Sequence, residues 1–181
     1  MSRNTRVLRG THFIVATKEY SEREFRFRSI VDQNRDRIGR VARVYAGSNA
    51  EDLVQEILMQ LWRGLPHYDS RAKLSTWCYR IALNTAISWR RDAQRLKRMP
   101  PEHRHGTETL VGQQHFSDEV ALLERFLATL SEVDRAILLM YLEDLTSEES
   151  AEAMGMSAGA IRTRLSRIRG QLRNWEASDG T

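Results

Sequence analysis

The stretch from Thr146 to Arg169 reads TSEESAEAMGMSAGAIRTRLSRIR. Thr146 and Glu149 have the spacing of a capping box, in which two side chains satisfy the free N–H groups at the start of a helix. Gly155 then supplies a turn, and Ser157 can cap a longer second helix. A short helix, a turn with glycine and a basic second helix are typical of a helix-turn-helix, whose second helix enters the major groove of DNA.

The second helix of this motif divides into an apolar face and a charged face. Ile161, Leu165 and Ile168 recur at helical spacing and predict the buried face. A merely solvated face usually mixes both signs of charge for pairing one turn apart, but residues 155–175 contain five arginines and no acid. We therefore interpret the arginines as a DNA-contacting surface, with an ordinary solvated face as the alternative. The side chains of that surface are Arg162, Thr163, Ser166, Arg167 and Arg169.

Helical periodicity continues through nearly the whole chain, and we find no run that alternates between apolar and polar residues as a strand does. We predict an all-α fold of two small helical domains joined by a flexible linker. Helices are expected over about residues 21–46, 49–63 and 75–95 in the first domain, with a capping box of Ser48 and Glu51, or of Asn49 and Asp52, opening the second. The expected ranges are 1–20 for an extension, 21–95 for the first domain, 96–116 for the linker, 117–175 for the second domain and 176–181 for a tail. Disorder and contact with a regulator both remain open for residues 1–20.

Charge is segregated along the chain. The net charge is +4, and residues 80–98 hold six bases and one acid. Residues 118–152 hold ten acids and two bases. A protein that touches DNA with two basic surfaces and a protein partner elsewhere is expected to separate its charges in this way.

Several classes of function find no support in the sequence. Cys78 is the single cysteine, so no internal disulfide framework and no multi-cysteine zinc site can form. We interpret it as a buried apolar residue. His103, His105 and His115 give only a weak hint of a metal site, so we expect no metal and no cofactor. A phosphate-binding glycine loop, a nucleophile motif and paired catalytic carboxylates are lacking, and we therefore expect neither an enzyme nor a small-molecule substrate.

The longest apolar run, Ala136 to Leu142, is far shorter than the ~20 residues that cross a bilayer. The basic residues near Met1 are not followed by an apolar segment with a cleavage site. We therefore expect a cytoplasmic protein with no membrane insertion.

Two blocks of the sequence resemble RNA polymerase sigma factors. The segment LSEVDRAILLMYLEDLTSEESAEAMGMSAGAIRTRLSRIR, from Leu130 to Arg169, resembles sigma region 4. NAEDLVQEILMQLW (Asn49 to Trp62) and STWCYRIALNTAISWRR (Ser75 to Arg91) resemble sigma region 2. The blocks follow in the family's order with no domain between them, which points to the extracytoplasmic-function class. The resemblance implies an alternative sigma factor that binds core RNA polymerase and directs promoter recognition, DNA opening and transcription initiation.

The resemblance implies that the second helix binds the clamp helices of the polymerase's largest subunit. The helix would offer the polar face made by Asp52, Gln55, Glu56, Met59 and Gln60. The first four of these residues lie at i, i+3, i+4 and i+7, and so independently share one face of a helix. From composition alone, an ordinary solvated face is the favoured alternative.

The resemblance also implies that the third helix and the loop before it open the promoter's melting element. Unpaired bases expose faces for stacking and edges for hydrogen bonds, which polar and basic side chains can hold. Trp77 and Trp89 could stack on bases, but aromatic residues on such a helix more often belong to the core. The expected contacts are Tyr68, Lys73, Thr76, Arg80, Asn84, Arg90 and Arg91.

On the recognition helix, the matching positions place Gly159, Arg162, Thr163 and Ser166 near base edges of the upstream promoter element. The same resemblance places Arg164 and Arg167 on phosphates. Arg162 is the strongest candidate for a base-specific contact, because an arginine fork can reach both acceptors of a guanine. Ser150 departs from the family, since an isoleucine usually stands there in the first helix of the motif.

Other functions remain open beside the sigma factor. A stand-alone helix-turn-helix regulator would not bind core polymerase, and a pure interaction module would not recognise promoters. The partners implied by the resemblance are the clamp helices and flap of core RNA polymerase, promoter DNA and an inhibitory anti-sigma protein.

Overall fold

The computed structural model describes residues 7–98 and 118–179. Within those ranges every regular element is helical and no strand occurs, which confirms the predicted all-α class. The predicted linker over residues 96–116 lies almost entirely outside the described residues, as do His103, His105 and His115.

The first three helices form a bundle in which each helix contacts the other two. They are α1 (Val7–Ala46), α2 (Ala50–Gly64) and α3 (Leu74–Arg98). Val41, Ile57 and Leu83, one from each helix, are fully buried. Cys78 and Trp77 are buried in the same core, which confirms the apolar interpretation of both. We call this bundle the N-terminal unit.

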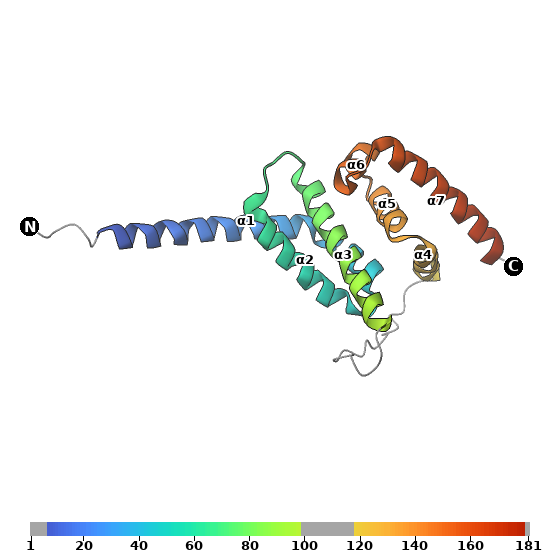
Figure 1. Ribbon diagram of the computed structural model, residues 1–181, viewed down its shortest axis with the longest axis horizontal. Helices are drawn as coiled ribbons and strands as arrows, with labels where there is room; N and C mark the ends of the chain where they lie inside the picture. The colour runs from blue at the N-terminus through green and yellow to red at the C-terminus, as the bar shows by residue number, and fades with distance from the viewer. Residues whose placement is uncertain (1–6, 99–117, 180–181) are drawn as a thin grey trace, which may run out of the picture.

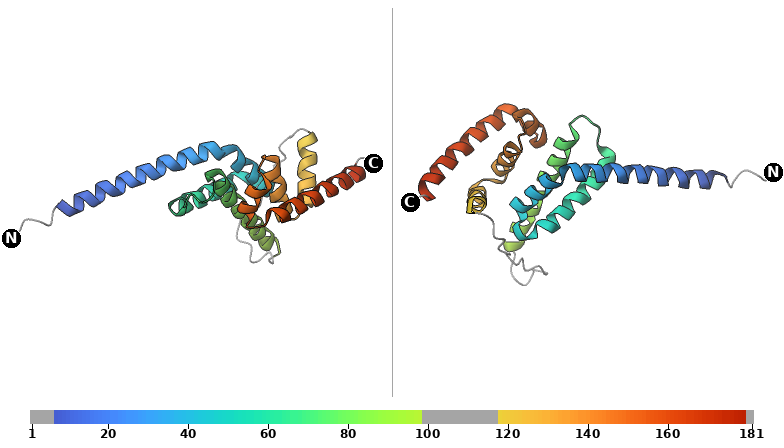
Figure 2. Two further views of the ribbon diagram at one scale, coloured as in Figure 1. Left: turned by 90° about the horizontal axis from the view of Figure 1, so that it is seen from above. Right: turned by 180° about the vertical axis from the view of Figure 1, so that it is seen from behind.

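Helix α1 begins well before the expected position near residue 21. It starts at Val7, and its first half projects away from the rest of the molecule (Figures 1 and 2). The sequence between Val7 and Tyr20 contains no proline, so no residue there prevents the helix from continuing towards the N-terminus. The expected helix start near residue 21 was therefore wrong, and contact of the N-terminal segment with a regulator stays a prediction.

The last four helices form the C-terminal unit, around the packing of α5, α6 and α7. The unit comprises α4 (Asp118–Thr129), α5 (Glu132–Leu142), α6 (Ser147–Met154) and α7 (Ala158–Asp179). Phe126, Ile137 and Ile161 are almost completely buried in its core. Ser150 is also buried, at 2 % exposure, so a small hydroxyl side chain fills the position where the family usually has isoleucine.

The helix ends of the helix-turn-helix follow the sequence prediction. The Thr146 side chain accepts a hydrogen bond from the Glu149 N–H, and the Glu149 carboxylate accepts one from the Thr146 N–H, so the predicted capping box is confirmed. Gly155 ends α6 with a φ of 64°, a left-handed conformation that favours glycine. Ser157 accepts a hydrogen bond from the Ala160 N–H at 3.2 Å, which confirms the cap of α7.

The predicted cap at the start of α2 was wrong. Asn49 precedes the helix but makes no side-chain capping hydrogen bond. Residues Gly47–Asn49 form a 3-10 turn, and Asn49 has φ −94° and ψ 20°. A capping side chain normally needs an extended backbone at this position, so the turn prevents either predicted box from closing.

Arg135 is the largest fully buried side chain in the described residues, at 1 % exposure. Its Nε donates to the Leu127 carbonyl oxygen at 2.8 Å and its Nη2 to the Leu130 carbonyl oxygen at 3.3 Å. These carbonyls close the C-terminal end of α4, where backbone oxygens lack partners within the helix. Arg135 therefore ties α4 to α5.

The two units lie against each other, with α3 beside α6 (Figure 1). The Tyr45 hydroxyl donates to the Glu132 carbonyl oxygen at 2.8 Å, across the two units. None of the helices in the described ranges is both long enough and apolar enough to cross a bilayer.

Candidate nucleic-acid interface

The recognition helix α7 buries one face and exposes the other. Ile161 and Ile168 are 0 % and 1 % exposed, and Leu165 is half-buried. The structure therefore separates apolar from polar side chains as the spacing predicts. Of the side chains expected at DNA, Arg164 is half-buried, and the exposed ones are Gly159, Arg162, Thr163, Ser166 and Arg167.

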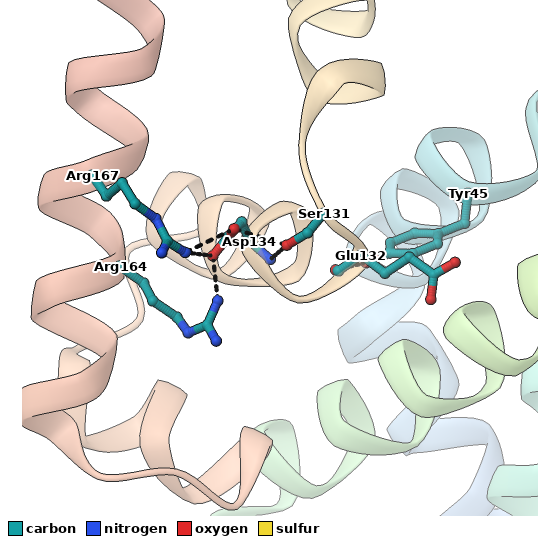
Figure 3. A network of polar contacts seen from close by, with 6 residues as sticks. All are labelled: Tyr45, Ser131, Glu132, Asp134, Arg164 and Arg167. Atoms are coloured by element: carbon teal, nitrogen blue, oxygen red, sulfur yellow. Dashed lines mark hydrogen bonds and ion pairs between the residues drawn. The ribbon is translucent and has the colours of Figure 1, made fainter.

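The arginines of α7 have different partners. Arg162 pairs with Glu148 of α6 at 3.1 Å, and both side chains are mostly exposed. Arg164 and Arg167 instead contact Asp134 in the first turn of α5, at 2.8 Å and 3.1 Å (Figure 3). The two arginines expected at phosphates thus share one carboxylate.

Sequence reasoning did not identify Asp134 as part of this site. Its side chain is only 8 % exposed, and no motif links it to residues about thirty positions later. Burial raises its pKa, but hydrogen bonds from Arg164 and Ser131 and the charge of Arg167 outweigh that effect, so the pKa lies below its usual value. The sequence signal at Asp134 was its spacing from Ser131, which predicts the start of a helix and does not indicate a contact with α7.

The outer face of α2 carries the residues expected at the polymerase. Asp52 and Gln55 are exposed and Met59 is 45 % exposed. Glu56 accepts a hydrogen bond from the Gln60 side chain at 2.7 Å. These side chains lie opposite the buried Leu53, Ile57 and Leu61. The helix therefore has one packed face and one open polar face.

An open cavity of about 720 Å³ lies between α2 and α3. It joins side chains of both predicted surfaces, since Glu56 and Gln60 line one side and Asn84 the other. Trp89 also lines the cavity while packing partly against the core. Arg80 and Arg91 are exposed on the same helix as Asn84 and Trp89.

The loop before α3 is stabilised by its own side chains. The Tyr68 hydroxyl donates to the Ala72 carbonyl oxygen at 2.7 Å, and its ring lies 5.2 Å from that of Trp77. Thr76 is only 4 % exposed and lines a cavity of about 300 Å³ between the two units. DNA could not reach Thr76 while the units keep this contact.

Two further melting-surface residues are paired with acids of the C-terminal unit. Lys73 contacts Glu149 at 2.6 Å, and Arg90 lies 4.0 Å from Glu132. The hydrogen bond from Lys73, followed by that from the Thr146 N–H, lowers the pKa of Glu149 to about 2. Acidic side chains therefore occupy positions where we expect DNA to bind.

Glu143 makes a third ionic contact between the units. It contacts Arg37 at 3.2 Å and also Arg40, both from α1. Burial raises the pKa of Glu143. The hydrogen bond and charge of Arg40, and then those of Arg37, lower it by more, so the pKa lies below its usual value. The ionic contacts between the units thus pair bases of the N-terminal unit with acids of the C-terminal unit.

A metal site receives no support from the described residues, in which no three His, Cys, Asp or Glu side chains gather.

Comparison with known proteins assigns both units. Residues 30–96 match the family model for Sigma-70 region 2, and residues 121–172 match the model for Sigma-70, region 4. The ECF RNA polymerase sigma factor SigW of Bacillus subtilis (strain 168) is 28% identical over 168 residues, covering 81% of this chain and 87% of that protein. The ECF RNA polymerase sigma factor RpoE of Cereibacter sphaeroides is 33% identical over 125 residues, covering 65% and 67%.

Solved structures share the fold. CnrH in complex with the cytosolic domain of CnrY superposes with a TM-score of 0.66 at 22% identity, covering 92% of this chain and 97% of that one. The sigma factor RpoE of Bartonella quintana, in complex with the anti-sigma factor NepR, has a TM-score of 0.64 at 22% identity and covers 82% and 94%. At this level of identity, the likeness supports the arrangement of helices.

Proposed function

Since this chain belongs to the sigma-70 family, in its extracytoplasmic-function class, we propose that it binds core RNA polymerase and directs initiation at a specific set of promoters. The observation that carries the proposal is the presence of both family regions in order, each with an exposed face of the appropriate chemistry.

In this proposal α7 reads the duplex at the upstream promoter element. Its exposed Arg162, Thr163 and Ser166 are placed to meet base edges in the major groove, because a recognition helix presents one face there. In the same proposal Arg164 and Arg167 bind phosphates, which fix the register of the protein on DNA.

The N-terminal unit opens the duplex in this proposal. Arg80, Asn84 and Arg91 form an exposed polar row on α3 that can bind a separated strand through phosphates and base edges. Three further residues, Lys73, Thr76 and Arg90, adjoin the C-terminal unit and join this surface once that unit has moved away. Tyr68 belongs to it from the loop before α3. The polar face of α2, from Asp52 to Gln60, is proposed to bind the clamp helices of the polymerase.

Further partners follow from the same proposal. Two structural neighbours were solved as complexes, one of them described as a complex with an anti-sigma factor, which supports an inhibitory anti-sigma partner for this chain. We also propose that the protein acts by binding rather than by catalysis, and that it works in the cytoplasm with the polymerase.

Transcription in vitro tests the proposal directly. The full chain is mixed with core RNA polymerase and a library of promoter fragments, and initiation and co-elution with core are measured. We expect start sites that depend on the chain. Binding to duplex DNA without co-elution or initiation would favour a stand-alone regulator, and co-elution without promoter selection would favour an interaction module.

A matched pair of variants tests the polymerase-binding face. Gln55→Arg replaces a neutral side chain with a positive charge at an exposed position on α2. The variant is expected to bind core at least tenfold more weakly, because a charge placed against an interface must be desolvated. Gln33→Arg, at an exposed position of α1, is the control and should leave binding unchanged. Equal binding by both variants would remove this face of α2 from the proposed interface.

A further inference from the structure

The first turn of α5 contains a carboxylate that faces the recognition helix. Asp134 Oδ1 lies 2.8 Å from Arg164 Nη1 and 3.2 Å from Arg167 Nη2, and Oδ2 lies 3.1 Å from that same Nη2 (Figure 3). The carboxylate is 8 % exposed, whereas the Arg167 side chain is 55 % exposed. The contact thus has an enclosed anionic end and an open cationic end.

The position of this carboxylate is fixed by the helix start itself. Ser131 caps α5 by accepting a hydrogen bond from the Asp134 N–H at 3.1 Å, and its hydroxyl donates to Asp134 Oδ2 at 2.8 Å. A carboxylate held in this way cannot swing into solvent as a surface aspartate does. It also stays ionised at neutral pH, because the hydrogen bonds and the two guanidinium groups together keep its pKa low.

Arg164 and Arg167 are three positions apart and therefore neighbours on one face of α7. An arginine carries five N–H donors, and each contact with Asp134 engages one terminal nitrogen of the guanidinium. The other donors of Arg167 belong to a side chain that is 55 % exposed. A guanidinium fixed at one end loses less conformational freedom when a phosphate binds the other end.

Arg162 provides the contrast on the same helix. Its partner Glu148 is 70 % exposed, and an exposed pair of this kind restrains its members weakly. Arg162 can therefore adjust to a base edge, whereas Arg164 and Arg167 are held in place. The structure thus distinguishes Arg162, whose partner is exposed, from Arg164 and Arg167, whose partner is nearly buried.

We propose that Asp134 is a positioning residue for promoter binding, which holds the guanidinium groups of Arg164 and Arg167 in the orientation that meets DNA phosphates. This inference rests on the proposed function and assigns a role to a residue outside the recognition helix. Because phosphate contacts carry no sequence information, the effect of Asp134 should be the same on every promoter sequence.

The test measures the affinity of holoenzyme, formed from the full chain and core polymerase, for duplex promoter fragments. Asp134→Asn is expected to weaken binding about tenfold, as for the loss of a charge-assisted hydrogen bond, while the ratio between matched and single-base-substituted promoters stays the same. In a chain that carries Arg164→Ala and Arg167→Ala, the further change Asp134→Asn should have no effect. A general loss of folding would instead add to the effect of the arginine variants.

Asp144→Asn is the matched control, because it makes the same chemical change at an exposed position of the C-terminal unit, whereas the acid that pairs with Arg164 and Arg167 is Asp134. Its affinity for DNA should equal that of the parent chain. Affinity of Asp134→Asn equal to or tighter than the parent would overturn the proposal, and so would a loss of the same size in the arginine-free background.

Two further measurements keep the test decisive. If Asp134→Asn does not fold, as judged by circular dichroism, Asp134→Glu replaces it, because that change keeps the charge but displaces the carboxylate by one methylene; parental affinity for Asp134→Glu would overturn positioning. Co-elution of the parent chain with core and promoter binding by the parent are measured first. If the parent chain neither co-elutes with core nor binds promoters, the proposed function is wrong. If the parent chain binds and Asp134→Asn binds equally well, only the role of Asp134 is wrong.

Discussion

Arg162 and Arg167 project from the same recognition helix but differ in what restrains them. Arg162 is paired with an exposed glutamate, and Arg167 with a nearly buried aspartate. Arginine has the same charge in both places, so the neighbours decide how firmly its guanidinium is held. The sequence predicted both arginines at DNA from their helix face, but it did not predict this difference.

Replacing these arginines should separate the two roles. Arg162→Ala is expected to cost about 1 to 3 kcal/mol in binding at one base position, whereas Arg167→Ala should weaken all promoters alike. The measurement is holoenzyme affinity for a set of promoters substituted one base pair at a time. An equal loss on every promoter for Arg162→Ala would remove it from the base-reading set.

Arg135 has a structural role, although arginine is a residue type that is seldom fully buried. Its buried guanidinium serves the carbonyls at the end of α4, and its Nη1 is buried with no hydrogen-bond partner among the described side chains and backbone. Arg135→Ala should lower the free energy of unfolding by about 2 to 4 kcal/mol, because it leaves a cavity and buried acceptors without donors.

Chemical denaturation with urea measures this loss. Arg173→Ala, at an exposed position of α7, is the control, since surface changes usually stay within about 0.5 kcal/mol. If both variants unfold at the same urea concentration, Arg135 does not stabilise the junction of α4 and α5.

Among the helices, the turn between α6 and α7 depends on one backbone conformation. Gly155 has a φ of 64°, and nothing would contact an added Cβ there. Gly155→Ala should therefore destabilise the protein by about 1 to 2 kcal/mol through the left-handed conformation alone. Thermal unfolding of Gly155→Ala, compared with that of the parent chain, gives the measurement.

Gly170 is the matched control for this prediction. It lies inside α7, and an added Cβ would likewise meet nothing within 4 Å. Gly170→Ala is expected to stabilise the helix by about 0.5 to 1 kcal/mol, because alanine loses less conformational freedom than glycine on folding. Changes of the same sign in both variants would contradict the account of the turn.

Sequence reasoning was most successful where structure is local. The caps of α6 and α7 depend on side chains three residues from the backbone groups they serve, and both were predicted correctly. The box at Asn49 failed because the preceding 3-10 turn sets its backbone. The early start of α1 was missed because the absence of an N-terminal stop signal does not by itself indicate a helix.

For the whole molecule, the contact between the two units could not be predicted from sequence. The segregation of charge was visible, with bases in residues 80–98 and acids in residues 118–152. Which acid would meet which base was not, because Lys73 and Glu149 are 76 positions apart. Only the folded chain brings such residues together, and it also places Arg37 and Arg40 of α1 against Glu143.

Glu143→Gln should loosen the contact between the units at neutral pH. Carboxyls with a lowered pKa stabilise a contact when they are ionised. Their contribution is complete above the ordinary pKa of 4.5 and is lost as the pH falls through the lowered pKa, which for Glu149 is about 2. The parent chain should therefore loosen between about pH 5 and pH 2. Glutamine at position 143 is expected to shift that transition to higher pH, because one ionised group has already been removed.

Fluorescence energy transfer between labels at introduced cysteines can measure this change. Exposed positions on α2 and α6, such as Glu51 and Glu152, suit the labels. Cys78 will not compete for the dye, because it is 1 % exposed and burial raises the pKa of its thiol to about 12.

Glu148→Gln is the control for the Glu143 variant, since its partner Arg162 belongs to the same unit. It should behave as the parent chain does. If the distance between the labels and its pH dependence do not change in Glu143→Gln, the ionic contact does not hold the units together.

The pairing of Lys73 with Glu149 and of Arg90 with Glu132 has a consequence for how strongly salt opposes promoter binding. Each phosphate that a free base neutralises releases cations condensed on the DNA, and that release makes affinity fall as salt rises. A base that is paired with a carboxylate must leave it in order to bind a phosphate. The carboxylate then becomes exposed and attracts cations from solution, which offsets part of the release from the DNA. The net release of cations should therefore be smaller than the number of basic side chains at the DNA.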